Sequence, residues 1–337
     1  MSSISTRISE ATISRRQFTL GATLAGAGLV LPLRQAQVFA AHHDFSGLDL
    51  PTLDVTVTAS GYEGIPETLE AGRYLVTVNS GEDVGEFGGG ASFIQPAGMT
   101  GDEFVAMLGE MGPPSEGQAA ATPMDAGAAE ASPPAEEMRP PPFLYESIMA
   151  GGVFAGAGES AQIVIDLTPG SWVAWGDDPE APQAPVVFEV TGEMPAELVE
   201  PGSAATLTMS EYAIEVIAGE LTTGSYVVKI DNIGAQPHFI GWFKVPDGLT
   251  AEQIQTVLDE EEQAMMTGTP PVYSDLNPEE DIVPVTFSGT QSGGTSQWIQ
   301  VADIEAGTHA MLCFFPDISD GAPHANHGMY TVVEIAG

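Results

Sequence analysis

The chain has 337 residues, enough for two domains of ordinary size. It carries 47 acidic residues against 8 basic ones, a formal net charge of -39. This charge excludes nucleic acid as a partner, because such binding depends on lysine and arginine contacts to phosphate. Hydrophobic residues make up 43% of the chain, too many for a disordered acidic polymer, and 39 glycines with 26 prolines favour a β-rich fold over long helices.

The N-terminal segment, residues 1–41, resembles a twin-arginine export signal. Arg15 and Arg16 precede a weakly apolar run that is too short to span a bilayer, which takes about 20 apolar residues. Small residues follow at VFAA, so we expect cleavage after Ala40 or Ala41. The sequence thus predicts an exported protein, periplasmic or extracellular at the cell surface, with no stable membrane insertion after cleavage. An uncleaved anchor is the alternative.

Removing the signal makes the chain more acidic. Loss of residues 1–40 takes away four arginines and one glutamate, leaving 46 acidic and 4 basic residues. Such a surface suits a partner protein with a basic face or a salty exterior. A surface selected only for solubility is the alternative.

Short runs of alternating apolar and polar residues begin near Leu53 and predict the strands of a β-sandwich. Four such runs lie in the first half of the chain, and four more follow in the same order in the second half. They are LDVTVTA (53–59), GRYLVTVN (72–79), SAQIVIDL (160–167) and PVVFEVTG (185–192), then YAIEVIAG (212–219), GSYVVKIDN (224–232), SQWIQVADI (296–304) and GMYTVVEI (328–335).

The connections between these runs repeat as well. SFIQPAGMTGDEF (92–104) matches WFKVPDGLTAEQI (242–254), and each reads as a strand end, a turn and a helix start. Thr100 and Thr250 are predicted N-caps, with Glu103 and Gln253 three residues later completing a capping box. We therefore expect an all-β fold of two tandem sandwiches with a short helix in each.

Composition sets the expected domain boundaries. The first sandwich is assigned to residues 48–192, interrupted at 112–142 by an insertion rich in Pro, Ala and Glu that is predicted to be disordered. Residues 193–205 form the predicted linker, and the second sandwich is assigned to 206–337.

Potential metal ligands gather in the second copy. The only cysteine, Cys313, ends a strand, His324 and His327 follow in a Pro, Asp and Gly loop, and Met329 opens the final strand. His238 lies about 75 residues upstream, directly after a turn. Two imidazoles and a thiolate with a weak thioether form a site that serves both Cu(I) and Cu(II).

In this order of residues the sequence resembles the cupredoxins, the small blue copper proteins of the plastocyanin and azurin type. The resemblance implies two Greek-key sandwiches, with one type 1 copper ion in the second held by His238, Cys313, His324 and Met329. His324 is favoured over His327, because HANHGM is similar to the plastocyanin-like loop pattern. The sequence departs from the family at Phe239, where many members have an asparagine that supports the thiolate.

Other histidines are expected to have no part in this site. His309 lies four strand residues before Cys313, about 13 Å away along an extended strand, too far to share its metal. If cleavage follows Ala40, the mature chain begins Ala-His-His, and the third-position His43 with the free amine could chelate Cu(II) in a square-planar manner, although a flexible tail that includes His42 and His43 is the simpler interpretation. The first copy has Gly176 in place of Cys313 and a stretch near Gly88 in place of His238, so no copper is expected there.

Two functions of different class follow from these observations. The first is an exported type 1 copper protein that carries single electrons between redox partners, one of them a protein with a basic face. The alternative is a metal-free cupredoxin-fold binding module with a vestigial ligand set. An enzyme is not expected, because multicopper oxidases and copper nitrite reductases need more imidazoles than the four of the second copy, and no Gly-x-Ser-x-Gly elbow is present.

Overall fold

A computed structural model of the protein describes most of the chain after the predicted signal. The described residues are 45–84, 88–111, 141–176, 183–267, 269–274 and 276–337. The predicted signal 1–41, His42 and His43 lie outside them. Residues 112–140 of the predicted insertion lie outside them as well, while Pro142 begins a helix.

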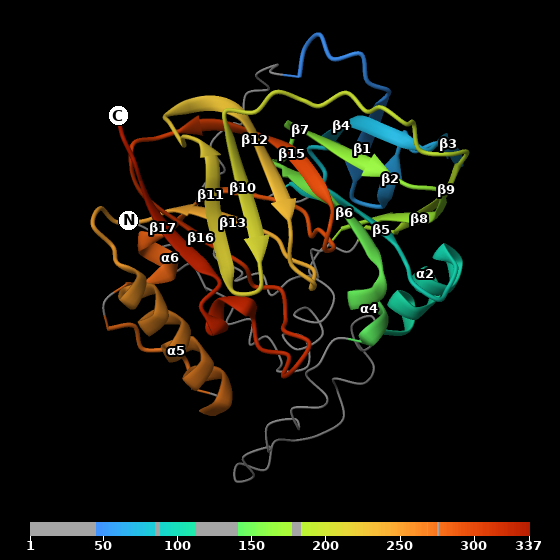
Figure 1. Ribbon diagram of the computed structural model, residues 1–337. Helices are drawn as coiled ribbons and strands as arrows, with labels where there is room; N and C mark the ends of the chain where they lie inside the picture. The colour runs from blue at the N-terminus through green and yellow to red at the C-terminus, as the bar shows by residue number, and fades with distance from the viewer. Residues whose placement is uncertain (1–44, 85–87, 112–140, 177–182, 268, 275) are drawn as a thin grey trace, which may run out of the picture.

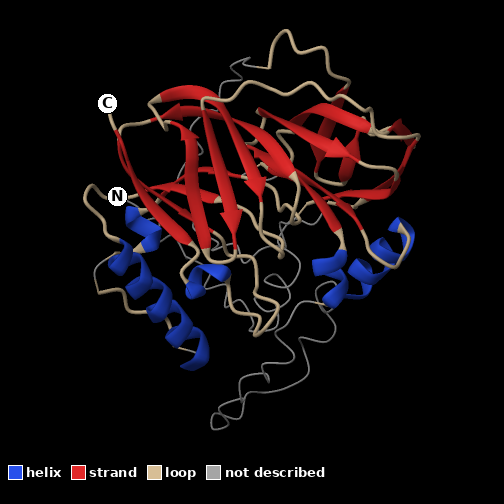
Figure 2. Cartoon of the chain, viewed as in Figure 1, coloured by secondary structure: helices blue, strands red, loops and turns tan. Residues whose placement is uncertain are grey.

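The first sandwich consists of two facing β-sheets (Figures 1 and 2). One contains strands in the order β2-β1-β4-β7, and the other contains β3-β9-β8-β5-β6. Helices α2 (Gly101–Met111) and α4 (Pro142–Glu146) lie between β5 and β6 in the chain. The strands are β1 (Thr52–Thr58), β2 (Gly61–Glu63), β3 (Thr68–Glu70), β4 (Gly72–Ser80), β5 (Gly89–Gln95), β6 (Ile148–Ala155), β7 (Ser160–Leu167), β8 (Gly170–Trp175) and β9 (Val186–Thr191).

The second sandwich repeats this plan. Its sheets have the orders β11-β10-β12-β15 and β14-β13-β16-β17, so eight of the first sandwich's strands have a counterpart. The strands are β10 (Ala205–Ser210), β11 (Ala213–Gly219), β12 (Gly224–Asn232), β13 (Gly241–Lys244), β14 (Val283–Phe287), β15 (Ser296–Ile304), β16 (Gly307–Leu312) and β17 (Tyr330–Ile335). The helical segments are α5 (Ala251–Thr267), α6 (Pro278–Asp281) and the 3-10 turn η1 (His324–His327).

The predicted fold class is therefore confirmed, since the described residues form two β-sandwiches with the same strand plan and only a few helical segments. Alternation of apolar residues explains the sandwich: in β1, Leu53, Val55 and Val57 are buried and the residues between them face outward or lie at partly covered positions. The second sandwich starts one residue earlier than expected, because Ala205 is already paired in β10.

Both predicted capping boxes form. The amide of Thr100 donates to Glu103 Oε2 at 2.8 Å, and the amide of Glu103 donates back to Thr100 Oγ1 at 3.2 Å. The amide of Thr250 donates to Gln253 Oε1 at 3.0 Å, with the reciprocal bond at 3.3 Å. Each box satisfies helix N–H groups that would otherwise lack partners.

The two sandwiches share one sheet. Strand β15 pairs antiparallel with β7, placing Trp298 opposite Val164 and Ile299 opposite Ile163, so eight strands form a continuous sheet. Arg73 reinforces this seam: its guanidinium lies 4.3 Å from the centre of the Trp298 ring and donates to both carboxylate oxygens of Asp166 at 2.7 and 2.9 Å. The sequence had not indicated this junction, because pairing between the two copies depends on their relative placement.

Among the described residues, no helix has both the length and the apolar composition needed to cross a membrane.

Candidate metal centre

His238 reaches the site from the loop between β12 and β13. Its backbone exchanges two hydrogen bonds with Gln291, from His238 N to Gln291 O at 2.9 Å and from Gln291 N to His238 O at 2.8 Å. The Asn232 amide also donates to the carbonyls of Gln236 and Gln291, at 2.9 and 2.7 Å, which fixes the turn before His238. The imidazole is thus held by a bonded loop and is fully buried.

The other three predicted ligands come from one folded loop between β16 and β17, residues 313–329, which we call the ligand loop. The amide of Cys313 donates to Met329 O at 3.1 Å, and the amide of Met329 donates to His324 O at 3.0 Å. The amides of Ala325 and His324 donate to the carbonyls of Cys313 and Phe315 at 2.7 and 2.9 Å. These backbone bonds bring Cys313, His324 and Met329 together, and all three side chains are fully buried.

Three donor atoms converge in this core. Nδ1 of His238 lies 2.9 Å from Nδ1 of His324, and Sγ of Cys313 lies 3.8 and 3.6 Å from these two nitrogens. A circle through the three atoms has a radius of about 2.0 Å, close to metal–nitrogen bond lengths of about 2.0–2.1 Å and slightly below the metal–sulfur length of about 2.3 Å. The donor set therefore fits a single ion.

Burial keeps the imidazoles neutral and thus able to bind a metal. It lowers the pKa of His238 to about 4, although the Glu211 carboxylate opposes this, and lowers the pKa of His324 to about 3, aided by the neighbouring His238. Nε2 of His238 has no hydrogen-bond partner, and Glu211 Oε1, at 3.8 Å, lies beyond hydrogen-bond range. The nitrogens that face each other and the sulfur are the two Nδ1 atoms, so these would be the ones to hold an ion.

The pKa of the Cys313 thiol shifts in the opposite direction to the pKa values of the two imidazoles. Burial raises its pKa to about 12, an effect opposed by the backbone N–H groups of Phe239 and Phe315, which donate to the sulfur. A bound cation would therefore be needed to stabilise the thiolate at neutral pH. Phe239, the predicted departure from the family, supports the sulfur through its backbone amide.

A polar layer covers His324. Its Nε2 lies 3.3 Å from Gln236 Oε1 and 3.5 Å from Asp317 Oδ2. Burial alone would raise the pKa of Asp317, but hydrogen bonds donated by Ser319, Gln236 and Tyr212 outweigh it and hold that pKa well below the usual range of a carboxyl group. Gln236 and Asp317 thus orient the imidazole, as outer partners of metal-binding histidines commonly do.

The other histidines have separate environments. His327 lies at the surface side of η1, with Nε2 3.2 Å from Asp320 Oδ1. His309 is buried, accepts a hydrogen bond from Trp242 Nε1 at 3.1 Å and bonds through Nε2 to the carbonyl of Glu305 at 3.0 Å. The structure places neither imidazole with the three converging donor atoms.

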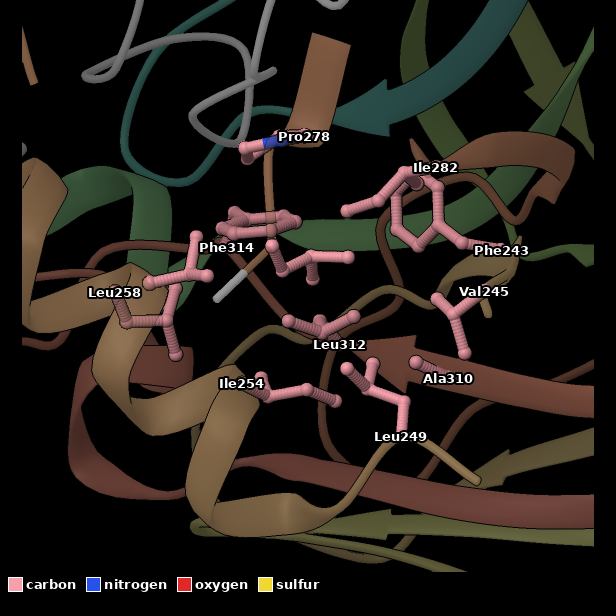
Figure 3. A pocket seen from close by; sticks show the side chains of 12 residues that line it. Phe243, Val245, Leu249, Ile254, Leu258, Pro278, Ile282, Ala310, Leu312 and Phe314 are labelled. Carbon is pink, nitrogen blue, oxygen red and sulfur yellow. The ribbon is translucent and has the colours of Figure 1, made fainter. Parts of the chain in front are cut away.

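The sequence placed the acidic residue Asp317 in a loop beside the site but did not indicate its contact with His324, and it did not single out Gln236 or Tyr212. The only available signal was their proximity in the chain to His238 and to the ligand loop, and Tyr212 comes from a distant turn between β10 and β11. Phe314, the neighbour of Cys313, lines an apolar cavity of about 40 Å³ with Leu312 and with Ile254 and Leu258 of α5 (Figure 3).

No protein-family model matches the sequence, and no curated protein matches it. Among solved structures, the chain is similar to dithionite-reduced auracyanin from Roseiflexus castenholzii, at 20% identity and a TM-score of 0.25 over 39% of this chain and 95% of that one. It is also similar to auracyanin A, a "blue" copper protein from Chloroflexus aurantiacus, at 15% identity and a TM-score of 0.22 over 39% and 99% of the two chains. Copper nitrite reductase from Nitrosomonas europaea matches 85% of this chain and 93% of its own at 9% identity and a TM-score of 0.21. These TM-scores are below 0.5, so the function is inferred from the donor atoms of this chain.

Proposed function

We propose that this protein is an exported type 1 copper protein that carries single electrons, with one copper ion held by His238, Cys313, His324 and Met329. The observation that supports this most directly is the convergence of two imidazole nitrogens and a thiol sulfur, 2.9 to 3.8 Å apart, in a fully buried core. A bound copper ion would supply a one-electron couple between Cu(I) and Cu(II).

Two further features support a role in electron transfer: a donor set that is held in place, and a ring that covers it. Backbone bonds within the ligand loop and between His238 and Gln291 keep the donor atoms in place, so little rearrangement accompanies a change in charge. The ring of Phe315, 6.1 Å from that of His324, helps to exclude water from the site.

An electron carrier also needs a surface where its partner docks close to the site. Ile233, Ile318 and Tyr212 are 65%, 50% and 40% exposed at the end of the second sandwich that carries the ligand loops. The amide of Ile318 donates to Gln236 Oε1, whose side chain lies against His324, and Tyr212 contacts the His324 ring edge-on at 6.0 Å. We define these three residues as the docking patch.

Two carboxylates neighbour the docking patch in the chain. Glu211 and Asp320 lie beside it, and no lysine or arginine occurs between Glu211 and Lys229 or beyond Lys244 in the sequence. The patch therefore fits a redox protein with an apolar centre and a basic rim. Weak association is expected at low salt and should be lost at high ionic strength.

The decisive experiment adds one equivalent of Cu(II) to the purified mature protein and records optical and paramagnetic-resonance spectra. An intense blue band with a narrow copper hyperfine splitting is expected for a thiolate-bound ion. The Cys313→Ser variant should lose the band while keeping its fold, as measured by circular dichroism. A His42→Ala/His43→Ala variant, which removes the alternative chelate at the N-terminus, should keep the band.

The same experiment decides between the two functional hypotheses. A folded protein that stays colourless with Cu(II), or gives only a square-planar signal that disappears in the His42→Ala/His43→Ala variant, would contradict the proposal. The fold would then serve as a metal-free binding module.

A further inference from the structure

The first sandwich touches the ligand loop of the second through α4. The Tyr145 hydroxyl donates to the carbonyl of Pro316 at 2.9 Å, and the Tyr145 ring meets the Phe315 ring edge-on, with centroids 5.8 Å apart and planes at 85°. Both contacted residues lie between Cys313 and His324. A side chain from one sandwich therefore braces the loop that presents two candidate ligands of the other.

Phe315 transmits this contact to the donor atoms. Its amide donates to the sulfur of Cys313, its carbonyl accepts the amide of His324 at 2.9 Å, and its ring lies 6.1 Å from the His324 ring. A shift of Phe315 would therefore alter its hydrogen bonds to both Cys313 and His324.

A second contact reaches the loop that pairs with His238. Ser292, the neighbour of Gln291, is buried, and its hydroxyl accepts from Met149 N at 2.8 Å and donates to Ser147 O at 2.7 Å. The amide of Ser292 donates back to Met149 O at 3.0 Å. Because Gln291 exchanges two backbone bonds with His238, the start of β6 is linked to this ligand as well.

We propose that the segment 145–149, at the end of α4 and the start of β6, is a structural part of the metal centre, with Tyr145 and Ser292 as positioning residues. Ten residues lie between Cys313 and His324, and such a loop needs outside contacts to hold two donor atoms in one geometry. The first sandwich, which lacks the ligand set, supplies these contacts. The role in copper binding rests on the proposed function, whereas the role in holding the loop does not.

The thiol of Cys313 gives a test that needs no metal. Cys313 is the only cysteine and is fully buried, so its reaction with a thiol reagent in the copper-free protein reports openings that expose the ligand loop, and a control variant separates local opening from global unfolding. We expect Tyr145→Phe and Ser292→Ala each to raise the labelling rate about tenfold, because each removes a bond that closes the loop. The matched control is Tyr74→Phe, which removes a similar bond to the carbonyl of Glu70, at 2.7 Å, in the first sandwich away from the site.

Copper spectra of the same variants complete the test. In the copper-loaded protein, Tyr145→Phe should widen the copper hyperfine splitting and change the reduction potential, effects that loss of global stability alone would not produce. Labelling rates and spectra that match those of Tyr74→Phe would overturn the inference even if the wild-type protein is blue. A colourless wild-type protein in which Tyr145→Phe and Ser292→Ala still speed labelling would overturn the proposed function but support the role of these residues in holding the loop.

Discussion

The two sandwiches share one strand plan and differ most where the second gathers its donor atoms. Gly88 and Gly89 stand in the place of His238, and Gly176 in the place of Cys313. A Cβ atom on Gly88 would lie 2.2 Å from the carbonyl oxygen of Ala155, and one on Gly176 would lie 2.6 Å from both Tyr62 Oη and Gln183 Oε1. The first sandwich has thus filled the equivalent space with backbone and two polar side chains.

The sandwich itself therefore does not create the cluster of donor atoms. Gln183, which is buried, comes from the short connection between β8 and β9, whereas the corresponding connection between β16 and β17 is longer and folds into η1. Trp172 and His309 occupy equivalent positions, and each bonds through a ring nitrogen to the carbonyl four residues earlier. The same strand plan therefore surrounds either a closed core or a cluster of candidate donor atoms, depending on the connection and on a few core residues.

The largest expected effect comes from removing the core tryptophan of the first sandwich. Trp172 is fully buried, so Trp172→Ala should lower the free energy of unfolding by about 3–5 kcal/mol. Because β7 and β15 join the sandwiches in one sheet, the loss should appear in both. Denaturant unfolding followed by tryptophan fluorescence and by Cys313 reactivity measures this.

The two probes also test how closely the sandwiches are coupled. Coincident transitions are expected in the wild type and in Trp172→Ala. If Cys313 became reactive at an unchanged denaturant concentration in Trp172→Ala, the second sandwich would fold on its own, and the shared sheet would be only a weak contact.

The next effect separates the two histidines of η1. His324→Gln removes a nitrogen 2.9 Å from that of His238, so Cu(II) affinity should fall at least about a hundredfold. His327→Gln should leave it within a few-fold, because His327 contacts Asp320 at the surface instead. Competitive titration against a chelator gives both affinities. A larger loss of affinity in His327→Gln than in His324→Gln would show that His327 is the ligand instead of His324.

Sequence patterns could predict the elements whose causes are local. The alternation of apolar residues predicted the strands, and the spacing of Thr100 and Thr250 from their partners predicted the two helix starts, because a strand face and a capping box each involve only nearby residues. The order of Cys313 and His324 in one loop also follows from the chain alone. These features recur in both halves, which made the repeat visible.

Contacts between distant segments could not be predicted in the same way. The pairing of β7 with β15, the position of Tyr145 on the ligand loop and the entry of Gln183 into the first sandwich all depend on how separate segments pack. Asp317 and Asp320 are both acidic residues of one loop, yet Asp317 is buried against His324 because three donors satisfy it. No periodicity in the sequence marks such a residue.

The position shared by Trp172 and His309 also predicts a difference in pH dependence. Burial lowers the pKa of His309, an effect reinforced by Lys244 and opposed by the Glu305 carbonyl and by the carboxylates of Glu334 and Glu305. The folded state therefore binds fewer protons than the unfolded state below pH of about 6.5, and stability contributed by His309 is present above that pH and is lost as pH falls. Protonation of Nδ1 would also break the bond from Trp242.

The His309→Gln variant isolates this contribution, since the other buried histidines remain. Unfolding free energies of the copper-free proteins, measured between pH 5 and 8, should fall less steeply with acidification in the variant than in the wild type, by at most about 1.4 kcal/mol per pH unit. Equal slopes, or an NMR titration of the His309 ring at or above its ordinary value, would show that the imidazole is not held neutral by the fold.

The smallest effect compares the two capping boxes, which are closely similar in geometry. Thr100→Ala and Thr250→Ala should each cost about 1 kcal/mol, because each leaves a helix N–H without its side-chain acceptor. In a single cooperative unit the two losses should be nearly equal and should add in the double variant.

The two helices differ in their neighbours, because α5 packs against η1 and lines the apolar cavity beside Phe314, whereas α2 lies on the first sandwich. Thr250→Ala should therefore also speed labelling of Cys313 more than Thr100→Ala does, and equal labelling rates would show that α5 does not stabilise the ligand loop.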